Sequence, residues 1–202
     1  MAVSPYENMP PSGWQAITQS LIDMHPLSTD KLVSATLAAW QGIFQSSIGG
    51  FYIGQDIFPK PQIMGFFLHE LVPLELSKFF PDTWREDRNA NEKDLVYIPD
   101  IKFSTEIKTS SHPTKIFGNR SYTQEGLSSK KDKSGYYIAI NFEPFKTRQY
   151  KPQILRIRFG WLDHSDWAGQ KAQTGQQSSL ATEVENNKLL VLYSNSTASD
   201  EG

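Results

Sequence analysis

The residue types best suited to chemistry are a glutamate and a lysine that alternate in the triplet Glu106-Ile107-Lys108. In a strand, the side chains of Glu106 and Lys108 project from one face, while Ile107 points the other way into the core. Carboxylates bind Mg²⁺, and an ammonium beside the metal can orient or deprotonate a water molecule or neutralise a transition state. Hydrolysis of a phosphodiester bond needs such a set. Because the same pattern is common as a solvated ion pair on exposed strands, its neighbours decide its meaning.

A further carboxylate is expected from one of two upstream aspartates, Asp94 and Asp100. Asp100 falls in an expected turn, and if the chain between it and Glu106 is extended, they lie about 20 Å apart. Asp94 comes directly before a predicted strand at 95–98. A hairpin folded near Asp100 would set Asp94 opposite Glu106 or Lys108, where cross-strand Cβ atoms are about 5 Å apart. We therefore predict Asp94 as the second metal ligand and keep Asp100 as the alternative.

The elements that must position these residues are predicted to be helices first and strands second. Ser12 and Ser28 can cap helices that run to about His25 and Phe44, and Pro61 can open a third helix. Pro73 is expected to kink or divide that helix. From about residue 94 the apolar pattern becomes strand-like, with strands expected at 95–98, 103–109, 136–142, 154–161 and 188–193. This order indicates an α/β or α+β domain, in which helices flank a mixed central β-sheet.

Composition excludes several kinds of site and partner. The chain has no cysteine, which removes disulfides, thiolate metal sites and cysteine nucleophiles, and which fits a reducing cytoplasm. We see no signal peptide and no apolar run near the roughly 18 residues that cross a bilayer, so we expect a cytoplasmic protein without a membrane partner. The four histidines are scattered and form no recognisable nucleophile arrangement.

Charge is distributed unevenly along the chain. The net charge is −2, yet residues 115–158 carry 10 Lys/Arg against 3 Asp/Glu. Residues 1–114 carry 8 against 13, and residues 159–202 carry 2 against 6. The middle segment can present a basic face to phosphates while the whole chain stays close to neutral. The alternative is that its lysines coat an exposed sheet edge or loop.

Polar and basic residues after the triplet are candidates for contacts with DNA. Arginine can bind guanine or a phosphate, and asparagine and glutamine can bridge the N6 and N7 atoms of adenine. The strand 154–161 alternates apolar and basic residues, which suits one face toward a polyanion, while 163–180 is polar with a helix expected in its second half. The predicted DNA-binding residues are Lys115, Asn119, Arg120, Ser121, Tyr122, Arg156, Arg158 and Gln170. The alternative is that these side chains satisfy backbone groups of their own loops or coat a helix.

The set of Asp94 with Glu106-Ile107-Lys108 resembles the active-site signature of the PD-(D/E)xK nucleases, a superfamily dominated by type II restriction endonucleases. Within it, longer runs are similar to the ScaI-type restriction enzymes, and together they span most of the chain. These runs are EKD at 92–94, EIKTSS at 106–111, IFGNRSY at 116–122, SGYY at 134–137 and GWLDHSDW at 160–167.

The resemblance implies a restriction-endonuclease-like fold, a homodimer, Mg²⁺ dependence and cleavage of double-stranded DNA at a short palindromic site. It would also imply the site AGTACT and blunt ends. Members of the superfamily often add an acid from an upstream helix, and Glu70 is the best match, with Glu75 as the alternative. Glu70 can equally be read as a surface charge.

We expect one nuclease domain over residues 1–194, with a helical part at 1–60 suited to dimerisation and a catalytic core at 61–194. The tail at 195–202 is expected to be disordered. Two other functions remain open from sequence: a DNA repair or mobile-element nuclease without a fixed site, and a catalytically silent DNA-binding module. The intact Asp, Glu and Lys set argues against the silent module.

Overall fold

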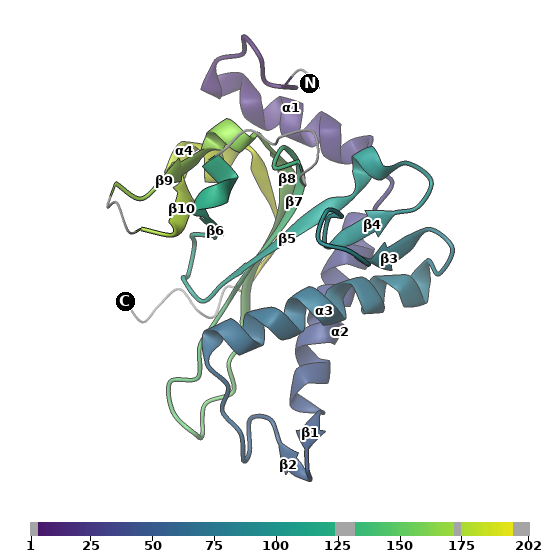
Figure 1. Ribbon diagram of the computed structural model, residues 1–202, viewed down its shortest axis with the longest axis vertical. Coiled ribbons are helices and arrows are strands. Elements are labelled where there is room, and N and C mark those ends of the chain that lie inside the picture. The colour runs from purple at the N-terminus through teal and green to yellow at the C-terminus, as the bar shows by residue number, and fades with distance from the viewer. Residues whose placement is uncertain (1–3, 124–131, 172–174, 196–202) are drawn as a thin grey trace.

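A mixed six-stranded sheet forms the centre of the molecule in a computed structural model that describes residues 4–123, 132–171 and 175–195 (Figure 1). Its strand order is β11-β8-β7-β5-β4-β3, in which β5 and β7 are parallel and the other neighbours are antiparallel. The predicted fold class, a mixed central sheet flanked by helices, is confirmed. The strands are β3 (Trp84–Glu86), β4 (Leu95–Tyr97), β5 (Thr105–Ser110), β7 (Gly135–Phe142), β8 (Ile154–Leu162) and β11 (Leu189–Ser194).

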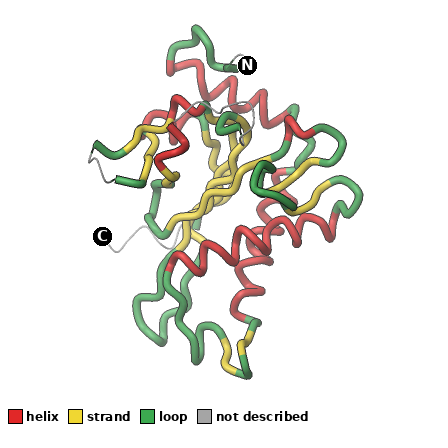
Figure 2. The backbone as a smooth tube through the Cα atoms, in the orientation of Figure 1, coloured by secondary structure: helices red, strands yellow, loops and turns green. Residues whose placement is uncertain are grey.

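Three helices pack into one apolar cluster with the main sheet, whose strands run through the middle of the molecule in Figure 2. These are α1 (Pro11–Asp23), α2 (Thr29–Phe44) and α3 (Pro61–Phe79). Their buried residues share this cluster with Ile107 of β5 and Phe159 of β8. The N-terminal helices and the strand of the triplet therefore belong to one continuous core. No helix in the described ranges is long and apolar enough to cross a membrane.

The helix boundaries follow the predicted signals in part. Ser28 caps α2, because its side chain accepts a hydrogen bond from the backbone of Lys31, and Pro61 opens α3. Ser12 does not cap α1, which already begins at Pro11. Pro73 lies inside α3 and does not divide it, since the buried side chains on either side of it remain on the same core.

A second, three-stranded sheet lies on the other side of the main sheet, in the order β6-β10-β9. Its strands are β6 (Phe117–Asn119), β9 (Trp167–Gly169) and β10 (Gln177–Leu180). The expected helix in the second half of 163–180 is wrong where the structure describes that segment, because Ser178 and Leu180 are buried alternately, as in a strand. The helix α4 (Thr182–Asn187) follows instead.

The small sheet and the main sheet enclose a second apolar cluster, to which β7 contributes Tyr137 and Ala139. The residues between and beyond them, Ile138 and Ile140, belong to the helix-side cluster. β7 is thus buried on both faces, and so is its parallel neighbour β5. This explains why β5 can carry a buried apolar residue on one face and charged residues on the other.

A short hairpin projects from the end of α2, at the lower end of the molecule in Figure 1. It consists of β1 (Ser47–Ile48) and β2 (Phe51–Tyr52). Gly49 and Gly50 form its turn with φ of 59° and 86°, a conformation that favours glycine. The two adjacent glycines therefore allow the tight turn between β1 and β2.

His25 joins the N-terminal helices to the segment that precedes β5. Its Nδ1 accepts a hydrogen bond from the backbone of Leu27 (3.2 Å), so its Nε2 carries the hydrogen and donates to the carbonyl of Phe103 (2.9 Å). Phe103 ends the short 3-10 helix η1 (Ile101–Phe103), which leads into β5. Burial lowers the pKa of His25 to about 4, although the hydrogen bond to Phe103 acts in the opposite direction.

Acid is expected to weaken the fold through His25. Because its pKa of about 4 in the folded state lies below the ordinary 6.5, the unfolded chain binds more protons between these values. The stabilising contribution of neutral His25 is therefore complete above pH 6.5 and is lost as the pH falls toward 4. Between pH 7 and pH 5 we expect the free energy of unfolding to fall by about 2 kcal/mol through this group.

Urea unfolding at the two pH values measures this effect. His25→Gln cannot titrate and should remove this part of the pH dependence, whereas His112→Gln, at an exposed histidine, should keep it. Equal pH dependence in the wild type and in His25→Gln would contradict the assignment.

Candidate active site

The register of β4 and β5 brings the first two carboxylates together. Leu95 pairs with Thr105, so the next antiparallel position sets Asp94 opposite Glu106. Asp94 Oδ2 accepts a hydrogen bond from the backbone N–H of Ile107 (2.7 Å), which fixes the carboxylate against β5. Asp100 instead caps η1, where its side chain accepts hydrogen bonds from Lys102.

Glu106 is buried and held by two neighbouring side chains. Its Oε1 lies 2.8 Å from Lys108 Nζ and also accepts a hydrogen bond from the hydroxyl of Tyr122. Lys108 Nζ is 3.1 Å from the carbonyl oxygen of Ile107 and lies over the Tyr122 ring, 4.7 Å from its centroid. The ammonium therefore sits between a carboxylate oxygen, a carbonyl oxygen and the negative face of an aromatic ring.

The structure gives Tyr122 a role other than the predicted DNA contact. Its side chain is 6 % exposed and lies in the short 3-10 helix η2 (Arg120–Thr123), packed against Trp167 of the small sheet. Burial, together with the negative charge of Glu106, raises the pKa of the Tyr122 hydroxyl well above its ordinary value. The hydroxyl consequently stays protonated and donates to Glu106.

α3 approaches β5 closely enough to bring a histidine to the site. A Cβ at Gly65 would lie 2.6 Å from Thr109 Oγ1, so only glycine allows this approach. His69, one helical turn further on, lies on the same side of α3, with its Nδ1 3.6 Å from Asp94 Oδ2. His69 was not predicted from the sequence, although its four-residue spacing from Gly65 places both residues on one side of a helix.

The two glutamates proposed as the extra acid occupy different surroundings. Glu70 is exposed and lines the same cavity as Asp94, but within the described part of the chain it forms no hydrogen bond or ion pair with Asp94, Glu106 or Lys108. Glu75 forms an ion pair with Lys78 (2.6 Å) on the surface of α3. Glu70 therefore remains the better candidate.

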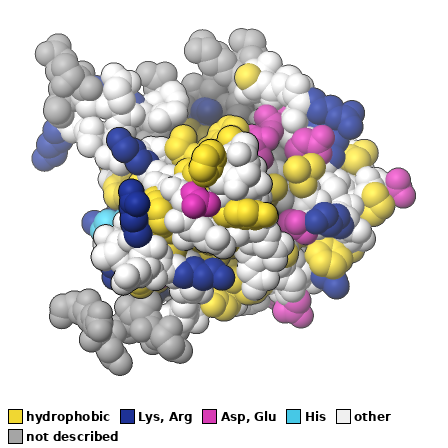
Figure 3. Space-filling model, turned by 90° about the horizontal axis from the view of Figure 1, so that it is seen from below, with side chains coloured by type: hydrophobic (Ala, Val, Ile, Leu, Met, Phe, Trp, Pro, Cys, Tyr) yellow, Lys and Arg dark blue, Asp and Glu magenta, His cyan; other side chains and the backbone are white. Residues whose placement is uncertain are grey.

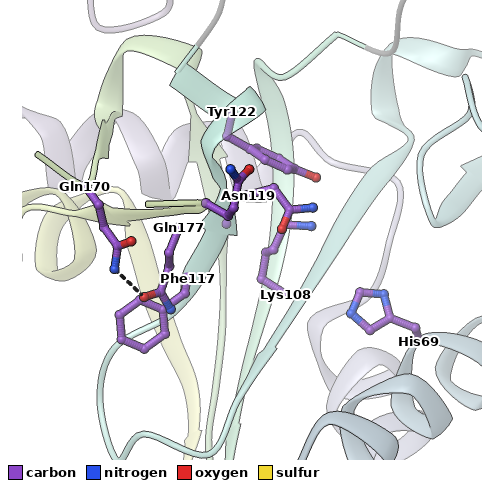
Figure 4. A pocket seen from close by; sticks show the side chains of 9 residues that line it. His69, Lys108, Phe117, Asn119, Tyr122, Gln170 and Gln177 are labelled. Carbon is purple, nitrogen blue, oxygen red and sulfur yellow. Dashed lines mark hydrogen bonds between the residues drawn. The ribbon is translucent and has the colours of Figure 1, made fainter. Parts of the chain in front are cut away.

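A cleft lies between α3 and the small sheet, with β5 along its floor (Figure 4). The part beside Lys108 has a volume of about 630 Å³, and the adjoining part beside Asp94 a volume of about 940 Å³. His69 lines both parts and projects from α3 on one side, as the close view shows. The side chains on the opposite wall are Phe117, Asn119, Gln170, Gln176 and Gln177.

The structure divides the other predicted DNA-binding residues into those that are accessible and those that are not. Asn119 and Gln170 are exposed and line the cleft. Lys115, Arg120 and Ser121 are exposed outside the residues that line it, and Arg156 is half-buried. Residues 124–131 of the basic segment, like the expected tail from 196 to 202, lie outside the described residues.

Arg158 is an internal residue and does not face DNA. It is 2 % exposed, donates to the carbonyl of Thr114 (2.6 Å) and the side chain of Asn141 (3.1 Å), and faces Glu185 at 3.8 Å. Glu185 in turn accepts the N–H of Ile116 (2.9 Å). Arg158 therefore belongs to a buried polar cluster, because a buried guanidinium must be paired. This cluster holds the loop between β5 and β6.

The geometry can support hydrolysis of a phosphate ester. Two carboxylates, a backbone carbonyl and an ammonium lie at the edge of a cleft. These groups can bind a divalent cation and can orient or deprotonate a water molecule. Within the described residues, no three side chains of the His, Cys, Asp and Glu types form a metal cluster. A cation here would therefore need the carbonyl, water or substrate oxygen to complete its ligands.

Comparison with known proteins bears on the whole chain. A family model described as ScaI restriction endonuclease matches residues 4–193. The curated protein "Type II restriction enzyme ScaI" from Streptomyces caespitosus is 52 % identical over 193 residues, which cover 94 % of this chain and 85 % of that enzyme.

Proposed function

The chain belongs to the ScaI restriction endonuclease family, and on this premise we propose that Asp94, Glu106 and Lys108 form its catalytic centre. It is a type II restriction endonuclease, a site-specific deoxyribonuclease whose substrate is DNA. Membership of the family favours this activity over a nuclease without a fixed site and over a silent binding module. The observation that carries the site assignment is the position of Asp94 opposite Glu106, with Lys108 against Glu106 at the edge of the cleft.

Enzymes of this kind are generally metal-dependent, and we propose Mg²⁺ as the ion. Asp94 and Glu106 would hold it, together with the carbonyl oxygen of Ile107, and all three are hard oxygen donors that suit Mg²⁺. The fit is supported by the donor set: Asp94 lies opposite Glu106, and Glu106 Oε1 and the Ile107 carbonyl already neighbour a positive charge, the ammonium of Lys108. When bound, the ion supplies charge stabilisation at the phosphate and acidifies a water molecule.

Each side chain of the centre has a separate task. The backbone N–H of Ile107 restrains Asp94, and the hydroxyl of Tyr122 restrains Glu106, so both carboxylates are oriented before DNA arrives. Lys108 lines the cleft, and its ammonium can hold the attacking water or contact the phosphate.

Two residues of α3 complete this side of the cleft. We propose that Glu70 assists the centre as an additional acid, since it lines the cavity beside Asp94. His69, close to Asp94 and facing Lys108 across the cleft, can donate a hydrogen bond to a phosphate oxygen.

DNA is proposed to lie along the cleft, with basic residues at its margins on the phosphates. Lys115, Arg120 and Ser121 are exposed near β6, which forms one wall, and Arg156 is partly accessible on β8. Phosphate contacts of this kind position a duplex without reading its sequence. Sequence must then be read by other side chains of the cleft.

We propose that the enzyme works as a homodimer on a palindromic site. A two-fold symmetric sequence is matched by a two-fold symmetric protein, and two chains supply one catalytic centre for each strand. Residues 1–60 are the proposed dimerisation part, within a single nuclease domain over 1–194. Its hairpin exposes Ile48, Phe51 and Tyr52. Figure 3, seen from the hairpin end, shows apolar side chains near the middle of that face, with both basic and acidic side chains among and around them.

Cleavage of a plasmid library, followed by sequencing of the ends, tests the activity and the catalytic assignment. With Mg²⁺ we expect fragments whose ends share one short palindrome. Lys108→Ala, Glu106→Gln and Asp94→Asn should each lower single-turnover cleavage by about 100- to 10,000-fold, because each removes a group that acts on the phosphate or the water. Asp100→Asn, at the alternative aspartate, should cut like the wild type. Full activity in Lys108→Ala, or loss of activity in Asp100→Asn alone, would overturn the assignment.

Tyr122→Phe tests whether the hydroxyl orients Glu106. The ring is kept, so the small sheet should still pack. We expect about 10- to 100-fold weaker activity or affinity for Mg²⁺, as is usual when a partner of a metal ligand is lost. The measurement is single-turnover cleavage as a function of Mg²⁺ concentration. Tyr6→Phe is the matched control, since Tyr6 is buried and its hydroxyl bonds Thr18. An unchanged Mg²⁺ dependence in Tyr122→Phe would exclude the positioning role.

Phe51→Asp tests the dimerisation part. A charge in an apolar interface has no partner and loses its hydration, so we expect this variant to be monomeric where the wild type is a dimer. Light scattering with and without a cognate duplex measures the mass. Ile101→Asp, at an exposed apolar residue of η1, is the control and should stay dimeric. A wild-type chain that remains a monomer on DNA would contradict the proposal.

A further inference from the structure

The wall of the cleft opposite α3 carries carboxamides rather than charges. Asn119, Gln170, Gln176 and Gln177 line the cavity that also contains Lys108, and all four are exposed. Among the lining residues of this cavity none is acidic, and the basic side chains are Lys108 on the floor and His69 on the other wall. The wall therefore offers donors and acceptors without a net charge, which suits base edges better than phosphates.

Three of these amides form a row across the three strands of the small sheet. Gln177 of β10 pairs with Asn119 of β6, so both side chains lie on the same face of the sheet. On the other side, Gln170 follows β9, and its backbone N–H donates to the carbonyl of Gln177 (3.0 Å). The order across the wall is thus Asn119, Gln177, Gln170.

Two members of the row are oriented by each other. The Nε2 of Gln170 donates to the Oε1 of Gln177 (3.1 Å), as the dashed line in Figure 4 marks. Gln177 then presents its NH₂ group as a donor, and Gln170 presents its oxygen as an acceptor. A pair held in this way loses less side-chain freedom on binding than two separate glutamines would.

We propose that the row Asn119–Gln177–Gln170 reads adenines through the major groove. The adenine edge combines an N7 acceptor with an N6 donor, and a carboxamide supplies the complementary donor and acceptor. Guanine presents two acceptors, which match arginine or lysine. Because the row and Lys108 line one cavity, the adenines that it reads lie close to the phosphate that is cut. This inference rests on the proposed function, since it needs DNA in the cleft.

Base analogues in the wild-type enzyme's own site test the proposal without any variant. Each adenine of a cognate duplex is replaced, one at a time, by 7-deazaadenine, which lacks the N7 acceptor. We expect at least one position to lower single-turnover cleavage by about 10- to 100-fold, the usual discrimination of a two-point contact. As a control, each guanine is replaced by 7-deazaguanine. The effect of this replacement on cleavage should be the same in the wild type and in variants of the amide row. Wild-type cleavage that is indifferent to 7-deazaadenine at every position would overturn the proposal.

Variants of the row then assign the contact. Gln177→Ala should cut the natural site about 10- to 100-fold more slowly and should lose its sensitivity to 7-deazaadenine at the affected position. Because Gln170 and Gln177 orient each other, the double variant Gln170→Ala/Gln177→Ala should lose less activity than the product of the two single losses. Gln19→Ala, at an exposed glutamine of α1, is the matched control.

Different results refute the proposed catalytic function and the proposed reading surface. A wild-type enzyme that cuts no DNA with any divalent metal refutes the proposed catalytic function. An enzyme that cuts at one site, while Gln177→Ala remains as sensitive to 7-deazaadenine as the wild type, keeps the function and refutes the reading surface.

Discussion

The hydrogen bond from the Ile107 N–H to Asp94 is the contact on which the site depends. β4 and β5 share only a short antiparallel ladder, and Asp94 lies just beyond its end. The carboxylate of Asp94 accepts the hydrogen bond from the Ile107 N–H where the strand pairing ends. This one interaction continues the contact between the two strands and places the acid beside Glu106. A longer connection between β4 and β5 would leave this register intact. A shift of β5 by one residue would instead turn the side chains of Glu106 and Lys108 to the helix side of the sheet.

The second constraint is the burial of Glu106. Its side chain is 3 % exposed, and a carboxylate at that depth needs compensation from nearby donors and charge. Lys108 supplies the charge and Tyr122 supplies a hydroxyl, and Tyr122 lies in η2, which directly follows β6 of the small sheet. The burial of one carboxylate, Glu106, therefore ties the small sheet to the main one. The cluster of Arg158, Asn141 and Glu185 holds the loop between β5 and β6, which leads into the small sheet.

The sequence predicted those features that depend on local pattern and simple strand geometry. The helical first third, the central strands and the proximity of Asp94 to Glu106 follow from periodicity, proline and serine positions, and the length of an extended chain. Features that depend on packing between distant parts of the chain could not be predicted from the sequence. Alternating Arg156 and Arg158 look the same whether β8 faces solvent or a second layer, and only the presence of α4 with Glu185 decides it. Tyr122 likewise needed the fold to place it over Glu106, and 177–180 has too few apolar residues to reveal its period as a strand.

The two walls of the cleft differ in the physics that they offer to DNA. The α3 wall brings His69 close to Asp94, and Glu70 lines the same cavity as Asp94, so this wall offers ionisable side chains. The small-sheet wall offers neutral amides, which carry no net charge to attract phosphates and bind through a matching pattern of donors and acceptors. A net charge of −2 is compatible with this arrangement. Non-specific attraction to DNA grows with the number of phosphates neutralised, so a chain with few cationic contacts in its cleft relies more on base edges for its affinity. If the small sheet reads the sequence as proposed, the hydrogen bond from Tyr122 links that reading to the orientation of Glu106.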